Sequence, residues 1–395
     1  MSEWKCYKLS EISSLSNGIN FEKSAYTSGV KLIGVSDFKN RIHPDYDSLQ
    51  EVDSKVVKSG DYLEKGDIVF VRSNGNKELV GRCMIIDRDI PVTYSGFCIK
   101  LRLKDKKRFE PVFFNYLFKT RQFKKSMTGT AVGANIQNLS QSRLGNCEIN
   151  VPDIEIQKNI ATILSRYDSL IENYQKQIKL LEEAAQRLYK EWFVDLRFPG
   201  HENTNIVDGV PEGWEKKKLH EIAEVVMGSS PKSEFYNNDK QGLPFHQGVG
   251  SYGTRFVDDN VYSTSITRLA EPNSILFSVR APVGRLNITK NKIIIGRGLA
   301  AMNHKDGFQS FLFYMLKDRF FMDNIIGNGS IFASISKVEL LDQEFIVPPM
   351  KTIKAFESLA SKLDKKIQGV DTQLRLLTEA RDRLLPKLMS GEITV

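Results

Sequence analysis

The chain has 395 residues, of which 41% are hydrophobic and 26% are charged. This composition excludes a disordered or fibrous protein, and the length predicts at least two folded domains. The net charge of +8 at pH 7 favours a polyanionic partner such as nucleic acid, because lysine and arginine neutralise phosphate groups. No uninterrupted apolar stretch approaches the roughly 18 residues that would cross a bilayer, so we expect no membrane partner and a cytoplasmic location.

The cysteines and histidines predict no metal site. Cys6, Cys83, Cys98 and Cys147 lie far apart without a C-x-x-C pair, which is typical of reduced thiols in a protein core. The five histidines are equally scattered and form no H-E-x-x-H motif. We therefore expect neither a structural nor a catalytic metal ion.

The first half of the chain predicts a globular α+β domain at residues 1–152, followed by a long helix at residues 153–197. Short apolar runs at residues 67–71, 82–86 and 96–103 are broken by Gly, Asn and Pro, which predicts strands joined by turns. An aromatic helix is expected at residues 111–125. Residues 198–212 are rich in Gly, Pro and Asn and predict a linker.

The second half repeats the first, with a domain at residues 213–348 and a helix and tail at residues 349–395. The repeated residues lie in the same order in both halves. They include, 210 positions apart, Trp4/Trp214, Leu9/Leu219 and Gly18/Gly228 and, 196 positions apart, Leu180/Leu376, Leu181/Leu377, Glu183/Glu379, Ala184/Ala380, Arg187/Arg383 and Leu188/Leu384.

Both long helices carry an apolar residue alternately every three and four positions, which is the period of a coiled coil. The predicted seam of the first helix contains Tyr167, Ile171, Tyr174, Ile178, Leu181 and Leu188, and that of the second contains Leu363, Ile367, Val370, Leu374, Leu377 and Leu384. We interpret the repeated helix as two rods that close their seams against each other. Helices that dock only onto their own domains are the alternative. Arg381 interrupts the second seam, and Pro386 is expected to kink or end its helix early.

No catalytic motif is complete. Gly248, Gly250 and Gly253 satisfy G-x-G-x-x-G, but β-like sequence follows them where a cofactor site would require a helix. A phosphate-binding G-x-x-x-x-G-K-[ST] loop is absent from the sequence, so we expect no ATP motor in this chain.

The order of these features resembles the specificity subunit of a type I restriction–modification system. W-x-x-x-x-L-x-E-I opens each half, I-N-V-P and F-I-V-P precede the long helices, and K-L-M-S-G-E-I closes the chain. The resemblance implies two target recognition domains on an intramolecular pair of antiparallel helices, without catalytic activity. It also implies double-stranded DNA, two methyltransferase subunits and two restriction subunits as partners. S-adenosylmethionine, ATP and Mg²⁺ would then bind to those partners and not to this chain.

Polar and basic side chains on loops are the expected contacts to DNA, because they match base edges and phosphates. The two halves offer such residues after an equivalent strand, on or beside the aromatic helix and before the long helix. The candidates are Arg72, Asn74, Asn76, Lys77, Lys124, Lys125, Asn135, Gln137, Arg280, Asn328, Ser330 and Ser334.

Two functions from different classes follow. The first is a DNA specificity subunit in which each domain recognises one half of a bipartite, asymmetric site, while the helices set the spacer and dock the methyltransferase. The alternative is a duplicated adaptor that binds protein and whose positive charge is incidental.

Overall fold

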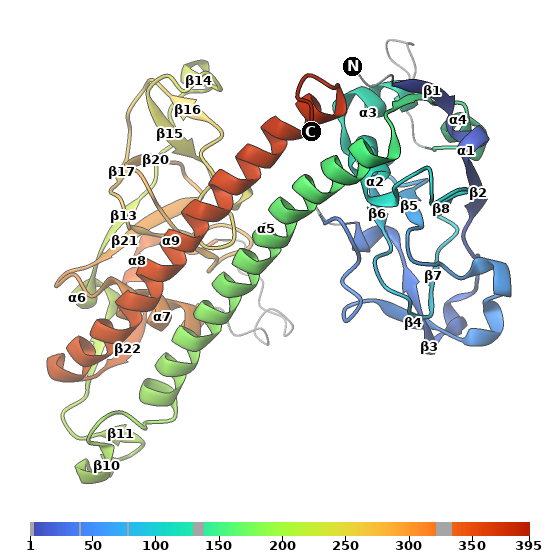
Figure 1. Cartoon of the computed structure of the whole chain (residues 1–395). Helices are drawn as coiled ribbons and strands as arrows, with labels where there is room; N and C mark the ends of the chain where they lie inside the picture. The colour runs from blue at the N-terminus through green and yellow to red at the C-terminus, as the bar shows by residue number, and fades with distance from the viewer. Residues whose placement is uncertain (1–3, 39–40, 77–78, 129–137, 321–333) are drawn as a thin grey trace. The chain divides into compact units, whose positions relative to one another are not determined.

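The computed structural model describes residues 4–38, 41–76, 79–128, 138–320 and 334–395 (Figure 1). The chain divides into two compact units. Unit 1 contains Met1–Tyr174 and Gln373–Val395, and unit 2 contains Gln175–Thr372. The two long helices, α5 (Ile154–Tyr189) and α9 (Met350–Met389), are both cut by this division. Each unit therefore contains a segment of both helices. Within the described ranges, no helix is long and apolar enough to cross a membrane.

The first domain, the part of unit 1 before α5, is built on a four-stranded antiparallel sheet in the order β2-β8-β5-β6. A second sheet has the order β4-β3-β7, with β3 and β7 parallel, and β1 pairs with β9. The strands are β1 (Lys5–Lys8), β2 (Ser13–Asn17), β3 (Tyr26–Ile33), β4 (Gln50–Val52), β5 (Ile68–Val71), β6 (Cys83–Ile85), β7 (Val92–Tyr94), β8 (Cys98–Leu103) and β9 (Glu148–Val151). The helices are α1 (Leu9–Ile12), α2 (Pro111–Lys119), α3 (Arg121–Thr128) and α4 (Gln141–Gly145).

The second domain, the part of unit 2 between the two long helices, repeats this plan. Its four-stranded sheet has the order β13-β21-β18-β19, a five-stranded sheet has the order β14-β16-β15-β20-β17, and β12 pairs with β22. The strands are β12 (Glu215–Lys218), β13 (Ala223–Met227), β14 (Tyr236–Asn237), β15 (Leu243–His246), β16 (Tyr262–Ser263), β17 (Leu269–Ala270), β18 (Ile275–Ser278), β19 (Leu286–Ile288), β20 (Ile293–Ile295), β21 (Leu299–His304) and β22 (Glu344–Val347). The helices are α6 (Leu219–Ile222), α7 (Gln309–Phe320) and α8 (Lys337–Leu341). Before this domain, β10 (Ile206–Val207) and β11 (Val210–Pro211) form a hairpin.

The predicted duplication is confirmed at the level of strand pairing. In both domains the second strand forms the edge of the four-stranded sheet and pairs with the strand that precedes the aromatic helix. A parallel pair also recurs, β3 with β7 in the first domain and β15 with β20 in the second. The predicted α+β class, with two duplicated domains joined by two long helices, is therefore correct.

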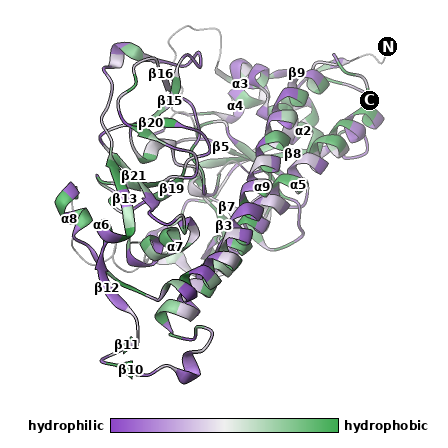
Figure 2. Ribbon diagram, turned by 90° about the vertical axis from the view of Figure 1, so that its left-hand side faces the viewer, coloured by the Kyte–Doolittle hydropathy of each residue, from purple (hydrophilic) through white to green (hydrophobic). Residues whose placement is uncertain are grey.

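The core of unit 1 explains why both long helices belong to it. Ile99 and Leu101 on β8 face a cluster that includes Phe114 and Phe118 of α2. Ile160 and Leu164 of α5 and Leu388 of α9 belong to this same buried cluster. Burying an aliphatic side chain contributes roughly 1.5–3 kcal/mol, so each long helix is held by its apolar stripe. Figure 2 shows the hydrophobic and hydrophilic residues that alternate along both helices.

The two helices are antiparallel. In unit 1, Arg381 of α9 donates a hydrogen bond to Asp168 of α5 at 2.5 Å. In unit 2, Tyr189 of α5 lies edge-on against Phe356 of α9, with ring centroids 5.9 Å apart. From the first contact to the second, the residue number rises along α5, from 168 to 189, and falls along α9, from 381 to 356. This is the pattern of an antiparallel pair. The predicted pairing is thus correct. The helices also pack on the domains, but not only on them, as the alternative required.

The predicted seam residues are all at least half-buried. Ile171, Ile178, Ile367 and Val370 are buried, whereas Tyr167, Tyr174, Leu181, Leu188, Leu363, Leu374, Leu377 and Leu384 are half-buried. By contrast, Leu180 and Leu376, one position before Leu181 and Leu377, are 54% and 53% exposed. The apolar stripe therefore faces inward as the heptad period predicts, and two repeated leucines lie outside it.

Arg381 is explained by a buried polar junction in unit 1. The hydroxyl of Tyr116 on α2 donates to Asp168 at 2.5 Å, and the Arg381 guanidinium bonds the other oxygen of the same carboxylate. Burial and the Asp168 charge raise the pKa of Tyr116, which keeps the hydroxyl protonated as a donor. The junction joins the aromatic helix of the first domain to both long helices.

An equivalent junction in unit 2 takes its arginine from a different element. Tyr314 of α7 donates to Asp364 of α9 at 2.8 Å, as Tyr116 does to Asp168. Arg255, in the loop after β15, donates to Asp364 at 2.6 Å, and its guanidinium lies 3.8 Å from Glu182 of α5. Arg255 is only 3% exposed. The tyrosine and the aspartate are repeated in both units. The arginine comes from α9 in unit 1 and from the loop after β15 in unit 2.

Two local expectations need correction. The aromatic helix predicted at residues 111–125 is two helices, because Thr120 has an extended backbone (ψ 149°) that separates α2 from α3. Pro386 does not end α9, which continues to Met389. A proline in the last helical turn removes a single backbone hydrogen bond close to the free end, where the loss is easily tolerated.

Candidate nucleic-acid interface

Two segments that the sequence singled out meet in the first domain. Strand β5 ends at Val71, and the chain continues through Arg72 and Ser73. Ser73 forms an isolated antiparallel bridge with Asn138, and the backbone N–H of Leu139 donates to the Arg72 carbonyl at 2.7 Å. The loop after β5 and the segment before α4 are therefore neighbours, although about 65 residues of sequence separate them.

The second domain repeats this contact at the equivalent positions. Arg280 forms an antiparallel bridge with Ser334, and the N–H of Ile335 donates to the Val279 carbonyl at 2.9 Å. Arg280 and Ser334 are both exposed. The structure thus brings two predicted contact residues side by side in unit 2, each with its side chain available to solvent.

A third segment, which sequence reasoning missed, completes the platform in each domain. In the turn between β7 and β8, the Phe97 carbonyl accepts a hydrogen bond from the Arg72 N–H at 2.8 Å. In the turn between β20 and β21, the Gly298 carbonyl accepts a hydrogen bond from the Val279 N–H at 2.9 Å. We define the contact platform of each domain as these three segments: residues 72–76, 95–97 and 138–139, and residues 279–285, 296–298 and 334–335.

Of the other predicted DNA-contacting residues, four lie within the described part of the chain. Asn74 accepts the Asn76 N–H at 2.7 Å, which fixes the tip of the loop as an Asx turn. Lys124 and Lys125 are exposed on α3. Lys77, Asn135, Gln137, Asn328 and Ser330 lie outside the described residues.

Lys124 belongs to a basic cavity in unit 1. The cavity has a volume of about 420 Å³ and is lined by Lys124 with Arg41, Arg82 and Lys119, beside the Asp168 and Arg381 ion pair. Burial lowers the pKa of Lys119, whose ammonium group donates to the Arg41 carbonyl at 2.9 Å. The excess of cations at this cavity favours an anionic group nearby.

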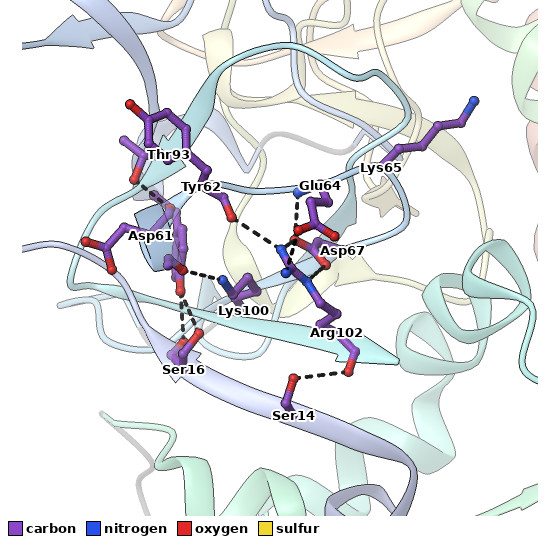
Figure 3. A network of polar contacts seen from close by, with 12 residues as sticks. Ser14, Ser16, Asp61, Tyr62, Glu64, Lys65, Asp67, Thr93, Lys100 and Arg102 are labelled. Atoms are coloured by element: carbon purple, nitrogen blue, oxygen red, sulfur yellow. Dashed lines mark hydrogen bonds and ion pairs between the residues drawn. The ribbon is translucent and has the colours of Figure 1, made fainter. Parts of the chain in front are cut away.

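A network of ion pairs and hydrogen bonds surrounds Asp67 and Lys100 in the first domain (Figure 3). Asp67, fully buried just before β5, receives two hydrogen bonds from Arg102 of β8, at 2.8 and 2.7 Å. Lys100, two residues earlier on β8, donates to the Gly60 carbonyl at 2.9 Å, and its ammonium lies 5.5 Å from the centre of the Tyr94 ring. The network fixes the beginning of β5 and the end of β7, and both strands lead directly into platform segments.

The network is structural in its chemistry. Burial raises the pKa of Tyr94 to about 12, and its hydroxyl lies 2.8 Å from that of Ser16. Hydrogen bonding to Asp67 raises the pKa of Arg102, so its guanidinium keeps its positive charge. A general acid or base would require a pKa close to neutrality, whereas the pKa values of Tyr94 and Arg102 are raised further above it.

The thiols offer no nucleophile in the core. Burial raises the pKa of Cys83 to about 11 and that of Cys98 to about 12, and it also raises the pKa of Cys147. Cys6 is exposed, so the expectation of four core thiols is wrong for this residue. In the described part of the chain, no group of three or more His, Cys, Asp and Glu side chains could hold a metal ion.

These features define a class of protein: a duplicated scaffold that presents two equivalent loop platforms, each joined to a pair of antiparallel helices. The sequence matches the family described as "Type I restriction modification DNA specificity domain" over residues 1–183 and 211–374. The chain belongs to this family of DNA specificity subunits of type I restriction–modification systems.

Curated relatives and a solved structure agree with this assignment. The chain is 31% identical to the putative type I restriction enzyme MjaX specificity subunit of Methanocaldococcus jannaschii, over 84% of this chain and 79% of the relative. It is 23% identical to the type I restriction enzyme HindI specificity subunit of Haemophilus influenzae, over the full length of both. The crystal structure of a type I S subunit from M. genitalium has the same fold, with a TM-score of 0.62 and 18% identity, over 98% of this chain and 96% of that one.

Proposed function

We propose that the two domains, at residues 1–152 and 213–348, each recognise one half of a bipartite, asymmetric DNA site. The observation that carries the proposal is the combination of a repeated scaffold with unlike platforms. The strand order and the junction with the helices recur in both domains, whereas the loop after β5 is Arg-Ser-Asn-Gly and the equivalent loop after β18 is Val-Arg-Ala-Pro. A repeated frame that presents different side chains is suited to two half-sites of different sequence.

The helices at residues 153–197 and 349–395 set the separation of the half-sites in this proposal. An α-helix rises 1.5 Å per residue and DNA rises 3.4 Å per base pair, so an added heptad of about 10 Å corresponds to about 3 base pairs. Seven residues inserted after Tyr174 in α5, together with seven after Thr372 in α9, preserve the antiparallel register of the seams.

The test of this ruler is methylation mapping of DNA by the complex with the methyltransferase. We expect the spacer to lengthen by about 3 base pairs with both half-sites unchanged. The matched control carries the same seven residues within the linker at 198–212, where the spacer should keep its length. An unchanged spacer in the helix variant, or altered half-sites, would contradict the proposal.

The helices also dock two methyltransferase subunits in this proposal, and two restriction subunits join the complex. Repeated residues that face solvent support two copies of one partner. Leu180 and Leu376 are about half exposed, and Arg187 and Arg383, seven positions later, are also exposed. Two identical partners would require two similar surfaces, and pairing between α5 and α9 gives no reason for outward-facing residues to be identical.

The chain itself is non-catalytic in this proposal, with S-adenosylmethionine, ATP and Mg²⁺ bound by the partner subunits. The purified chain supplied with S-adenosylmethionine should methylate no DNA, and the addition of methyltransferase should produce adenine methylation at one bipartite sequence. The adaptor alternative predicts no DNA binding. Phosphate contacts instead predict affinity for duplex DNA that falls steeply as the salt concentration rises.

A further inference from the structure

The turn at residues 95–97 and the turn at residues 296–298 are held in the same frame. Gly18 and Gly228, a repeated pair, each lie against the turn of their own domain. A Cβ atom on Gly18 would lie 2.2 Å from the Tyr94 carbonyl oxygen, and one on Gly228 would lie 2.1 Å from the Gly296 carbonyl oxygen. No side chain could occupy either position without displacing backbone, so glycine is required in both halves.

Backbone hydrogen bonds complete the frame on both sides of each turn. Gly18 N–H donates to the Cys98 carbonyl at 3.2 Å, and Gly228 N–H donates to the Leu299 carbonyl at 2.9 Å. The opposite side bonds the platform loop, at Arg72 in the first domain and Val279 in the second. A side chain on either turn is therefore presented from a fixed backbone, which is the condition for accurate contact with a partner.

The side chains at the tips of these turns differ completely. Phe97 is 61% exposed, and its ring contacts no other aromatic ring within the described residues. In the second domain the exposed side chain of the turn is Arg297, for which the described part of the chain provides no carboxylate partner. Ser230 accepts the Arg297 N–H at 3.1 Å and donates to Gln247 at 2.8 Å, which fixes the backbone beneath the guanidinium.

We propose that these two turns carry base-recognising side chains, with an apolar contact in one half-site and a guanidinium contact in the other. Phe97 would contact the methyl group of a thymine in the major groove, because that methyl is the apolar feature of a base edge. Arg297 would bond the O6 and N7 atoms of a guanine, because its planar fork matches these two acceptors. This inference rests on the proposed recognition of a bipartite DNA site.

The placement of both residues carries the inference. Each turn is bonded to the loop that follows the central strand, and that loop meets the segment before α4 or α8. An exposed phenylalanine, and an arginine that has no carboxylate partner among the residues described, contribute little to the stability of the free domain. Their fixed position beside the loop that follows the central strand is then explained by contact with a ligand.

The test measures base preference at each position of the two half-sites, with the methyltransferase complex and a library of randomised DNA. Phe97→Ala should lower the preference for thymine at one position of the first half-site, and Arg297→Ala should lower the preference for guanine at one position of the second. We expect a reduction of about tenfold or more in each case, with the other half-site unchanged. Arg297→Lys should also lose the guanine preference, because an ammonium group lacks the fork.

Two matched controls separate recognition from general loss of charge or apolar surface. Lys305→Ala removes one exposed cation at the opposite end of β21, and Val207→Ala trims an exposed apolar residue of the β10–β11 hairpin. Both should leave all base preferences intact. If Arg297→Ala and Phe97→Ala instead weaken methylation equally at every sequence, the residues contact the phosphate backbone or act only on folding, and the inference is wrong. A wild-type complex without any bipartite preference would instead overturn the proposed function itself.

Discussion

Replacement of Arg255 should destabilise unit 2 far more than replacement of an exposed arginine. The Arg255 side chain is 2% exposed, lies 3.6 Å over the ring of Phe313, and donates to Asp364 at 2.6 Å. Arg255→Met keeps most of the aliphatic volume but removes the cation. Among the described residues, Asp364 then keeps the hydrogen bond from the Tyr314 hydroxyl, and Glu182 loses its ion pair with Arg255.

The expected cost follows from the burial of the groups left behind. Removal of one partner of a buried ion pair costs about 3–5 kcal/mol, because the remaining charge is uncompensated. Asp364 and Glu182 keep 21% and 18% side-chain exposure, so water recovers part of their solvation. We therefore expect the lower end of this range, about 3 kcal/mol of unfolding free energy, or a melting temperature about 6–12 °C lower for a unit of this size.

The position of the tryptophans allows unit 2 to be measured separately. Trp192 and Trp214 belong to unit 2, and Trp4 belongs to unit 1. In a Trp4→Phe background, urea unfolding followed by tryptophan fluorescence reports unit 2 alone. Arg268→Met, an exposed arginine of the same unit, is the matched control and should change the free energy by less than about 0.5 kcal/mol. A loss below about 1 kcal/mol for Arg255→Met would refute the reasoning about the buried junction.

Four further predictions concern pH, thiol chemistry and assembly. The hydrogen bond from His43 to a carboxylate of α5 raises the pKa of His43. His43 therefore stabilises unit 1 fully below pH ~6.5, and this contribution is lost as the pH rises through the raised pKa. His43→Gln should cost more stability at pH 6 than at pH 8. Burial lowers the pKa of His304, so unit 2 loses stability as pH falls below ~6.5, and urea titrations should find that His304→Gln costs less at pH 6 than at pH 8. A thiol reagent should label Cys6 rapidly in the native protein and the other three cysteines only after unfolding. Leu180→Glu or Leu376→Glu alone should lower the number of bound methyltransferase subunits from two to one by native mass spectrometry, and an unchanged number would count against docking at these leucines.

The parts of the fold that could be predicted are those encoded locally or by repetition. A seam with alternating spacings of three and four residues predicts a paired helix without knowledge of the domains, and the two predicted seams lie within α5 and α9. The repeated tryptophan, leucine and glycine at the start of each half predict a repeated domain, and the matching strand orders confirm it. Such signals are independent of where distant segments meet.

The contacts that depend on distant segments were not predictable. Arg381 looked like a defect in the seam, because its partner Asp168 lies more than 200 positions earlier on another helix. The turn at residues 95–97 carries no motif and differs in sequence from its counterpart. The repeated pair Gly18 and Gly228 was the available signal for it, since a glycine kept in both halves indicates a close backbone approach, but the sequence does not say to what.

The repeated helical segment also requires a second explanation beyond the pairing of the helices. Leu181/Leu377 and Leu188/Leu384 are half-buried and face inward, so mutual packing accounts for their similarity. Leu180/Leu376 and Ala184/Ala380 are exposed, and packing within the chain places no constraint on them. Elsewhere on the helices equivalent positions have diverged freely, as with Ala185 and Arg381, even where both are covered. The identical residues on the outward faces of the two helices therefore need a separate explanation. Two copies of one partner that bind two equivalent surfaces would provide it.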